Sequence, residues 1–228
     1  MKKEVIVFSL GGSLIVPDKV DYNFLHKFKV FINRLKIKCN IVIVTGGGKT
    51  ARNYIKAVRS ENLKHYFESL VGIETTKLNA RLVGGFLNLS CRIPDSLKEV
   101  KQELFNHNIV VCGALGFQPD MTSDGDAAQI AVYLKAKMFV NVTNVNGLYD
   151  KDPNKFKNAK LIPEISYKNF LNILNNIKYE SGQHFVLDQR AAETIAKNKI
   201  KTVIINGKDF NNLWNFILNK KFTGTIIQ

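Results

Sequence analysis

Three glycine-rich segments of the sequence have the composition of phosphate-binding turns. They are Gly11-Gly12-Ser13, Gly46-Gly47-Gly48 and the stretch from Gly113 to Gly125. Glycine has no Cβ, so backbone N–H groups in such a turn can approach an anion closely. A helix that begins directly after the turn adds the positive end of its dipole. One such turn also serves ordinary chain reversals, but three in one chain favour an anion-binding site.

The common nucleotide-binding fingerprints do not account for these turns. The sequence contains neither G-x-x-x-x-G-K-[ST] nor G-x-G-x-x-G. The P-loop and the Rossmann dinucleotide motif are therefore excluded as explanations. An anion site built from these glycines must belong to another arrangement.

Two cations follow the second glycine turn. Lys49 and Arg52 are three residues apart, so they can face the same side of the first turn of a predicted helix. Cations at a helix N-terminus oppose the helix dipole by about 0.3–1 kcal/mol, and a bound phosphate would reverse that penalty. Two solvated charges are the alternative interpretation. The adjacent glycines favour a phosphate-binding role for both residues.

Two acids close the third glycine-rich segment. Asp124 and Asp126 lie near the start of the next predicted helix, where N-cap or first-turn acids need no functional explanation. As a functional pair, they would orient cations or Mg²⁺. Both interpretations stay open at this point. The four histidines have no ligand spacing, so the sequence predicts no metal site of the protein's own.

The elements that position these residues alternate between strands and helices. The glycine-rich segments follow apolar runs that are typical of buried parallel strands. The predicted strands are Val5 to Leu10, Ile41 to Val44, Ile109 to Cys112, Met138 to Val142 and Thr202 to Ile205. The predicted helices cover Leu25 to Leu35, Lys49 to Val58, Leu78 to Leu89, Ala127 to Leu134 and about Phe185 to Lys199. A last helix precedes Gly224 to Ile227, which we expect to be a closing edge strand.

This alternation predicts an α/β fold, in which a mostly parallel sheet has helices on both faces. Ligands of such sheets bind beyond the carboxyl ends of the strands. No linker, repeat or low-complexity segment interrupts the 228 residues, and we predict one domain.

The charge of the chain is strongly positive. Its 33 Lys and Arg against 19 Asp and Glu give a net charge of +14. Such a balance attracts polyanions and phosphorylated small molecules. The basic residues form no block of five to eight, which weakens a nucleic-acid-binding interpretation.

Compartment signals are few. No apolar run reaches the roughly 20 residues that span a bilayer, and the N-terminus has no pattern of a secretory signal. The three cysteines, Cys39, Cys91 and Cys112, form no C-x-x-C and suggest neither disulfides nor zinc. We therefore expect a cytoplasmic protein that has no contact with membranes.

Four motifs together resemble the amino-acid kinase superfamily, and within it the archaeal-type UMP kinases. The resemblance extends from about Val5 to Ile227. The T-N-V-x-G-x-Y-x-x-D-P segment marks the superfamily, and G-G-G-K-x-A-R narrows the choice to UMP kinases. The motifs are Ser9-Leu10-Gly11-Gly12-Ser13, Gly46-Gly47-Gly48-Lys49-Thr50-Ala51-Arg52, Pro119 to Asp126, and Thr143 to Pro153.

The resemblance implies a three-layer αβα sandwich with an acceptor-binding N-terminal part and an ATP-binding C-terminal part. It implies transfer of the γ-phosphoryl group of ATP, bound with Mg²⁺, to UMP. It also implies a homo-oligomer, namely a hexamer built as a trimer of dimers.

The resemblance assigns roles to single residues. Catalysis is assigned to Gly12, Lys49 and Arg52. ATP binding is assigned to Gly12, Ser13, Gly48, Arg52, Thr143, Tyr149 and Asp152. UMP binding is assigned to Gly47, Glu68, Phe117, Gln118, Pro119, Asp120, Met121, Thr122 and Ser123.

Four positions depart from the family pattern. Ser9 replaces the phosphate-binding lysine of other branches, which archaeal-type enzymes also lack. Glu68 and Asn146 each replace a more usual aspartate, and Asp120 stands where glycine is common. Asp120 places a negative charge near the expected UMP phosphate, so its side chain is predicted to turn away from it.

Two alternatives to a UMP kinase remain. The first is a kinase of the same superfamily with another acceptor, such as isopentenyl phosphate. That branch uses a histidine near the second glycine turn, where this chain has Lys49 and Arg52. The second is a non-catalytic nucleotide- or nucleic-acid-binding regulator, motivated by the charge of +14 and by the unusual Asp120 and Asn146.

Overall fold

The structure is a computed structural model, and it describes residues 3–89, 92–118, 121–151, 153, 155–176 and 186–228. Its centre is a seven-stranded sheet with the strand order β3-β2-β1-β4-β6-β7-β5. All neighbouring strands are parallel except β6 and β7, which are antiparallel. The strands are β1 Val5–Leu10, β2 Asn40–Thr45, β3 Ile109–Cys112, β4 Met138–Thr143, β5 Glu164–Ile165, β6 Thr202–Asn206 and β7 Thr225–Ile227.

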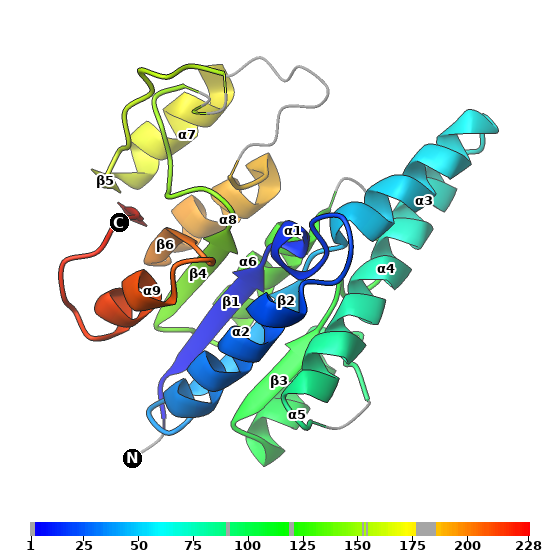
Figure 1. Cartoon of the computed structure of the whole chain (residues 1–228), viewed down its shortest axis with the longest axis horizontal. Helices are drawn as coiled ribbons and strands as arrows, with labels where there is room; N and C mark the ends of the chain where they lie inside the picture. The colour runs from blue at the N-terminus through cyan, green and yellow to red at the C-terminus, as the bar shows by residue number, and fades with distance from the viewer. Residues whose placement is uncertain (1–2, 90–91, 119–120, 152, 154, 177–185) are drawn as a thin grey trace.

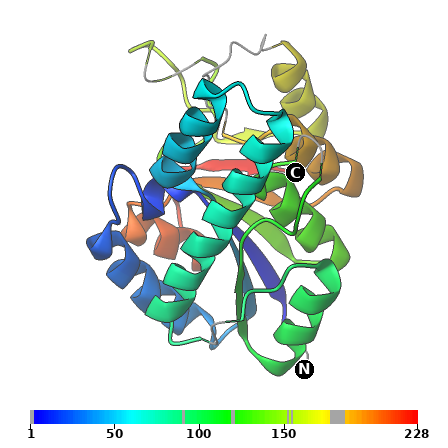
Figure 2. The same cartoon turned by 90° about the vertical axis from the view of Figure 1, so that its right-hand side faces the viewer.

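Helices cover both faces of the sheet, which gives the predicted three layers (Figures 1 and 2). One core lies under α1 Gly12–Ile15, α2 Tyr22–Leu35, α4 His65–Phe86 and α9 Phe210–Ile217. The other core lies under α5 Leu97–Asn106, α6 Ser123–Tyr133, α7 Tyr167–Asn176 and α8 Gln189–Asn198. The remaining helix, α3 Gly48–Ser60, packs along α4 as an antiparallel pair (Figure 1).

The apolar runs form central strands because both of their faces are buried. In β1, Phe8 and Leu10 belong to the core of α2, whereas Val7 belongs to the core of α6. Ser9 lies on the α6 side of the same strand and is 1% exposed. A strand of this kind has no solvent face, and its sequence therefore lacks polar alternation.

The five predicted strands are confirmed, and the predicted closing strand is present but is not at an edge of the sheet. β7 lies between β6 and β5 and pairs with both, so it is not an edge strand. The edges of the sheet are β3 and the two-residue β5. Helix α8 begins at Gln189 because Asp188 is its N-cap and accepts the Ala191 N–H at 2.9 Å.

Helices α5 and α7 were not predicted. A local signal for α5 is present in the sequence, because Ser96 accepts the Glu99 N–H at 3.2 Å and Glu99 accepts the Asp95 N–H at 3.0 Å. This S-x-x-E pattern is the sequence signature of a capping box, and here Glu99 accepts the N–H of the residue that precedes the N-cap. Among the described residues, no helix is both long and apolar enough to cross a membrane.

Candidate functional site

The strand register brings the first two glycine turns to the same point on the carboxyl edge of the sheet. Leu10 at the end of β1 is level with Thr45 of β2 and with Val142 of β4. The Gly46 N–H donates to the Leu10 carbonyl at 2.9 Å, and the Gly11 N–H donates to the Val142 carbonyl at 2.9 Å. The two turns therefore lie side by side, each at the end of one of two neighbouring strands.

The two turns touch through their backbones, and this contact requires glycine. A Cβ on Gly12 would lie 2.6 Å from the carbonyl carbon of Gly46 and closer still to the amide nitrogen of Gly48. Gly48 has a φ of +65°, and a Cβ there would lie 2.9 Å from the Val16 carbonyl oxygen. Side chains are excluded from the space between the turns. Residues predicted to hold the phosphates of ATP and UMP are thus brought together.

Helix α4 holds the second turn and the third loop. The buried Asn79 side chain donates to the Gly46 carbonyl at 2.7 Å. Thr45 donates to the Thr76 carbonyl at 2.8 Å, and the Thr76 hydroxyl accepts the Ala114 N–H at 2.8 Å. Both segments are therefore fixed to one turn of one helix.

The N-terminus of α3 presents unbalanced positive charge. The helix begins at Gly48 and has no acidic residue in its first turn. Its first N–H groups have no partners within the helix. Lys49 is half-buried and Arg52 is exposed, and neither has an ion pair with a carboxylate in the described part of the chain. The Lys49 N–H donates to the Val16 carbonyl at 2.9 Å, so the positive potential here comes from the two cations and the helix dipole, which together suit a phosphate.

The third glycine-rich segment leads into α6, whose N-cap is Thr122. The Thr122 oxygen accepts the Asp124 N–H at 3.2 Å, and its hydroxyl donates to Asp188 at the start of α8. Asp124 and Asp126 are first-turn residues of α6, one of the two placements expected from the sequence, and neither is the N-cap.

Both acids have strongly shifted pKa values. Burial raises the pKa of Asp124 to about 7, Asp188 adds to that rise, and a hydrogen bond from the Ser9 hydroxyl opposes it. Burial and Asp188 likewise raise the pKa of Asp126 to about 7, against a hydrogen bond from the backbone of Leu115. The contact between Ser9 and Asp124 could not be predicted from the sequence, because no local pattern links residues 115 positions apart.

Dedicated metal ligands are not grouped in this region. No three His, Cys, Asp or Glu side chains of the described residues are arranged to hold a metal ion. The acids of α6 differ in their partners, since Asp124 faces Ser9 on β1 and Asp126 faces the preceding loop.

The predicted acceptor residues lie on two elements. Phe117 packs edge-to-face on Tyr66 of α4 with ring centroids 4.8 Å apart, and Gln118, Met121, Thr122 and Ser123 continue into α6. Pro119 and Asp120 lie outside the described residues. Glu68, two residues after Tyr66 in α4, pairs with Arg59 of α3 at 2.7 Å. Because Arg59 is 11 positions after Gly48, this pair lies about 16 Å along α3 from the second turn.

The residues predicted to bind ATP also lie on more than one segment of the chain. Thr143 ends β4, and a Cβ on Gly11 would lie 3.8 Å from the Thr143 Cα, so Thr143 is adjacent to the first turn. Tyr149 lies further along the chain, where it forms a β-bridge with Leu161. Asn146, in the segment that leads from Thr143 to Tyr149, accepts a hydrogen bond from Asn206 at 3.0 Å. This bond holds that segment at the end of β6. Asp152 lies outside the described residues.

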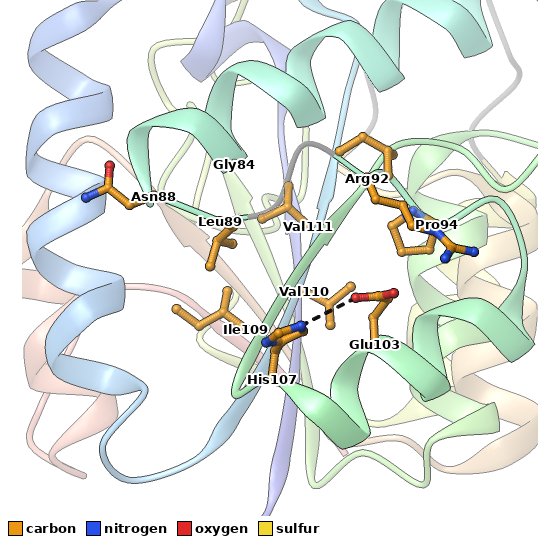
Figure 3. Close-up of a pocket in the computed structure, with 11 residues that line it drawn as sticks. Gly84, Asn88, Leu89, Arg92, Pro94, Glu103, His107, Ile109, Val110 and Val111 are labelled. Atoms are coloured by element: carbon orange, nitrogen blue, oxygen red, sulfur yellow. Dashed lines mark ion pairs between the residues drawn. The ribbon is translucent and has the colours of Figure 1, made fainter.

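A pocket of about 170 Å³ lies away from the glycine turns, toward the N-terminal end of β3 (Figure 3). Apolar side chains of β3 and of the segment after α4 form much of its lining, and His107 pairs with Glu103 at 3.7 Å. None of its lining residues is a predicted site residue. The pocket is therefore separate from the glycine turns.

Comparison with known proteins agrees with this geometry. The model of the amino acid kinase family matches residues 4–206. A uridylate kinase from Methanococcus aeolicus is 37% identical over 98% of this chain and 99% of its own, and one from Thermoplasma volcanium is 34% identical over 99% and 98%. The crystal structure of a uridylate kinase from Archaeoglobus fulgidus superposes with a TM-score of 0.86 at 31% identity, covering 100% of both chains. A UMP kinase from Ureaplasma parvum, 22% identical with a TM-score of 0.81 and 100% of both chains covered, shares the fold.

Proposed function

The chain belongs to the amino acid kinase family, and on that basis we propose that it is a UMP kinase that transfers the γ-phosphoryl group of ATP to UMP. The observation that carries the proposal is the match to archaeal uridylate kinases, which are 31–37% identical over almost the whole chain. The paired glycine turns and the cations of α3 agree with it.

The chemistry requires little from side chains beyond positioning and charge. The acceptor in UMP is already a phosphate oxyanion, so no strong general base is needed. The protein must bring two anions together in line and offset the charge of the transferred group. Backbone N–H groups, Lys49 and Arg52 at the start of α3 supply positive potential for both tasks.

The site divides between the two substrates as follows. Gly12, Ser13, Gly48 and Arg52 hold the ATP phosphates, and the segment from Thr143 through Tyr149 to Asp152 lines the adenosine side. Gly47 and the segment from Phe117 to Ser123 hold UMP, with Glu68 at the outer end of α3 and α4. The contact between the first and second turns supports this division, because residues assigned to the two substrates lie next to each other there. In this division the N-terminal part of a single domain, residues 1–228, binds the acceptor, and the C-terminal part binds ATP, whose phosphates reach the glycine turns of the N-terminal part.

Mg²⁺ enters as a component of the ATP substrate. It would neutralise part of the charge of the nucleotide phosphates. The resemblance to archaeal-type UMP kinases also supports a homo-oligomer, a hexamer built as a trimer of dimers, that acts in the cytoplasm. Light scattering after gel filtration measures the oligomer size.

Acceptor choice is the most direct test of the proposed function. Purified protein with Mg²⁺-ATP is expected to convert UMP to UDP, with a higher kcat/KM for UMP than for CMP, AMP or GMP. A coupled assay of ADP formation across these four acceptors measures the preference, and nucleotide chromatography identifies the product.

Isopentenyl phosphate is the critical competitor in the same assay. A kcat/KM for isopentenyl phosphate equal to that for UMP would overturn the assignment and favour another kinase of the family. Absence of transfer to every acceptor, with sub-micromolar binding to nucleic acid at about 150 mM salt, would favour a regulator, because nonspecific electrostatic binding is weak at that salt.

A further inference from the structure

We propose that Asp126 is a positioning residue that holds the acceptor loop, defined here as residues 115–118, against α6 in the conformation that receives UMP. This inference rests on the proposed function of the same loop. The contacts of Asp126 are with the acceptor loop and not with the first two glycine turns, so it would act through the loop and not on the reacting atoms.

The side chain of Asp126 is buried beneath this loop. The residue is 1% exposed and lies in the first turn of α6, beside the buried Ala127 and Ala128. Its carboxyl accepts the backbone N–H of Leu115 and lies 3.4 Å from Nε2 of Gln118. Both partners belong to the acceptor loop. Asp126 thus connects the two ends of the loop to one point on α6.

Other contacts join the same loop to the same helix. The side-chain amides of Gln118 and Gln129 face each other, with N–O distances of 3.2 and 3.4 Å. The Met121 N–H donates to the Gln118 carbonyl at 3.2 Å, and a Cβ on Gly125 would meet the Met121 sulfur directly. The loop therefore folds back over the first turn of α6, with Asp126 as the buried member of the contact.

Helix formation alone does not explain a carboxyl at this position. Thr122 already caps α6, so Asp126 is not needed as the cap. In the described part of the chain, Asp126 forms no salt bridge with Lys, Arg or His. A buried carboxyl without a cation is unfavourable unless hydrogen bonds offset its desolvation. The hydrogen bonds that do so here come from the acceptor loop.

The ionisable groups around Asp126 determine how loop order depends on pH. They are Asp188 at the start of α8, the Cys112 thiol at the end of β3, and Asp124 in the same helical turn, which faces Ser9. Burial, aided by Asp188, raises the pKa of Asp126 to about 7. In an open loop the carboxyl would be solvated and would titrate near its ordinary value of about 3.9.

The sign of the effect follows from this difference. A carboxyl whose pKa is higher in the ordered loop takes up a proton as the loop orders. The advantage of the ordered loop is therefore complete below about pH 4 and is lost progressively as the pH rises through about 7. We expect the KM for UMP of the unmodified protein to rise between pH 6 and pH 8.

Two substitutions separate the hydrogen bonds from the charge. Asp126→Asn keeps a neutral group of nearly the same shape, whose amide oxygen can still accept a hydrogen bond from Leu115 or Gln118. Its KM for UMP is expected to match the unmodified protein at pH 6 and to be at least threefold lower at pH 8. Asp126→Ala removes the hydrogen bonds, and its KM for UMP is expected to rise at least tenfold at both pH values. For Asp126→Ala, kcat and the KM for ATP are expected to stay within threefold.

The matched control is Asp209→Ala, which removes the N-cap of α9 far along the chain from the loop. It is expected to lower the Tm without changing the KM for UMP. Titration of UMP's own phosphate near pH 6 affects all the proteins alike and cancels in the ratio between them. Hydrogen exchange at Leu115 gives a readout without substrate, and it is expected to be faster in Asp126→Ala than in Asp126→Asn.

The outcomes distinguish this inference from the proposed function. If the unmodified protein does not phosphorylate UMP, the proposed function fails, and hydrogen exchange still tests the loop. If UMP is phosphorylated but Asp126→Ala has an unchanged KM and unchanged exchange at Leu115, the positioning role is wrong. If Asp126→Asn has the same pH profile as the unmodified protein, the titrating group is not Asp126.

Discussion

Gly12→Ala is expected to lower kcat/KM for UMP phosphorylation by at least about a hundredfold, or about 2.7 kcal/mol of transition-state stabilisation. The new Cβ would lie 2.6 Å from the Gly46 carbonyl carbon and 2.7 Å from its oxygen. Both atoms belong to the backbone, so no side-chain rotation can relieve the overlap. The two turns would have to separate, and a displacement of about 1 Å in a reacting geometry can reduce the rate by about a hundredfold.

The matched control for this substitution is Gly85→Ala. A Cβ on Gly85 meets nothing within 4 Å, and the residue lies in the last turn of α4. In a helix, alanine is favoured over glycine by about 0.5–1 kcal/mol. We expect Gly85→Ala to keep its activity and to gain stability slightly. Circular dichroism and thermal unfolding of both variants separate a lost site from a lost fold. Near-normal activity of a folded Gly12→Ala protein would show that phosphate transfer does not need the close contact between the turns.

Arg52→Ala is expected to lower kcat/KM at least about tenfold, or about 1.4 kcal/mol. Arg52 is exposed near the start of α3, so its removal should leave the fold intact. A guanidinium can bind phosphate through two parallel hydrogen bonds, which a lysine ammonium cannot reproduce. Arg52→Lys is therefore expected to recover only part of the loss. Steady-state kinetics with each substrate varied in turn show which phosphate Arg52 serves.

Arg34→Ala serves as the charge control for Arg52. Arg34 is an exposed arginine in the last turn of α2, away from the glycine turns in the sequence. Arg34→Ala lowers the net charge by the same amount as Arg52→Ala does. Equal losses in the two variants would mean that general electrostatic attraction, and not a contact of Arg52, supports activity. Full activity of a folded Arg52→Ala protein would remove Arg52 from the site.

The sequence was most informative where a local pattern and its structural cause coincide. Val5–Leu10 is apolar because both faces of β1 are buried, and the glycines after it are needed because another backbone lies against them. Such causes are visible in a few consecutive residues. The strands, the glycine turns and the start of α3 could be predicted for this reason.

Features that depend on residues far apart in sequence could not be predicted in this way. The shifted pKa values of Asp124 and Asp126 arise from burial and from Asp188, which no spacing in the sequence reveals. The position of β7 depends on its pairing with the two-residue β5, a strand too short to have a pattern. Glu68 was assigned through family resemblance, and its pairing with Arg59 emerged only when α3 and α4 were seen together. Its role toward UMP stays a prediction.

Because two segments of the proposed site are attached to α4, the distance between them is a property of helix geometry. Thr76 binds the third loop and Asn79 binds the second turn, three residues apart on one helix. Three residues correspond to a rise of about 4.5 Å and a rotation of about 300°. Inserting one residue between Thr76 and Asn79 would rotate one anchor by about 100° relative to the other and withdraw it from its partner. The gap between Thr76 and Asn79 should therefore tolerate changes of residue type far better than changes of length.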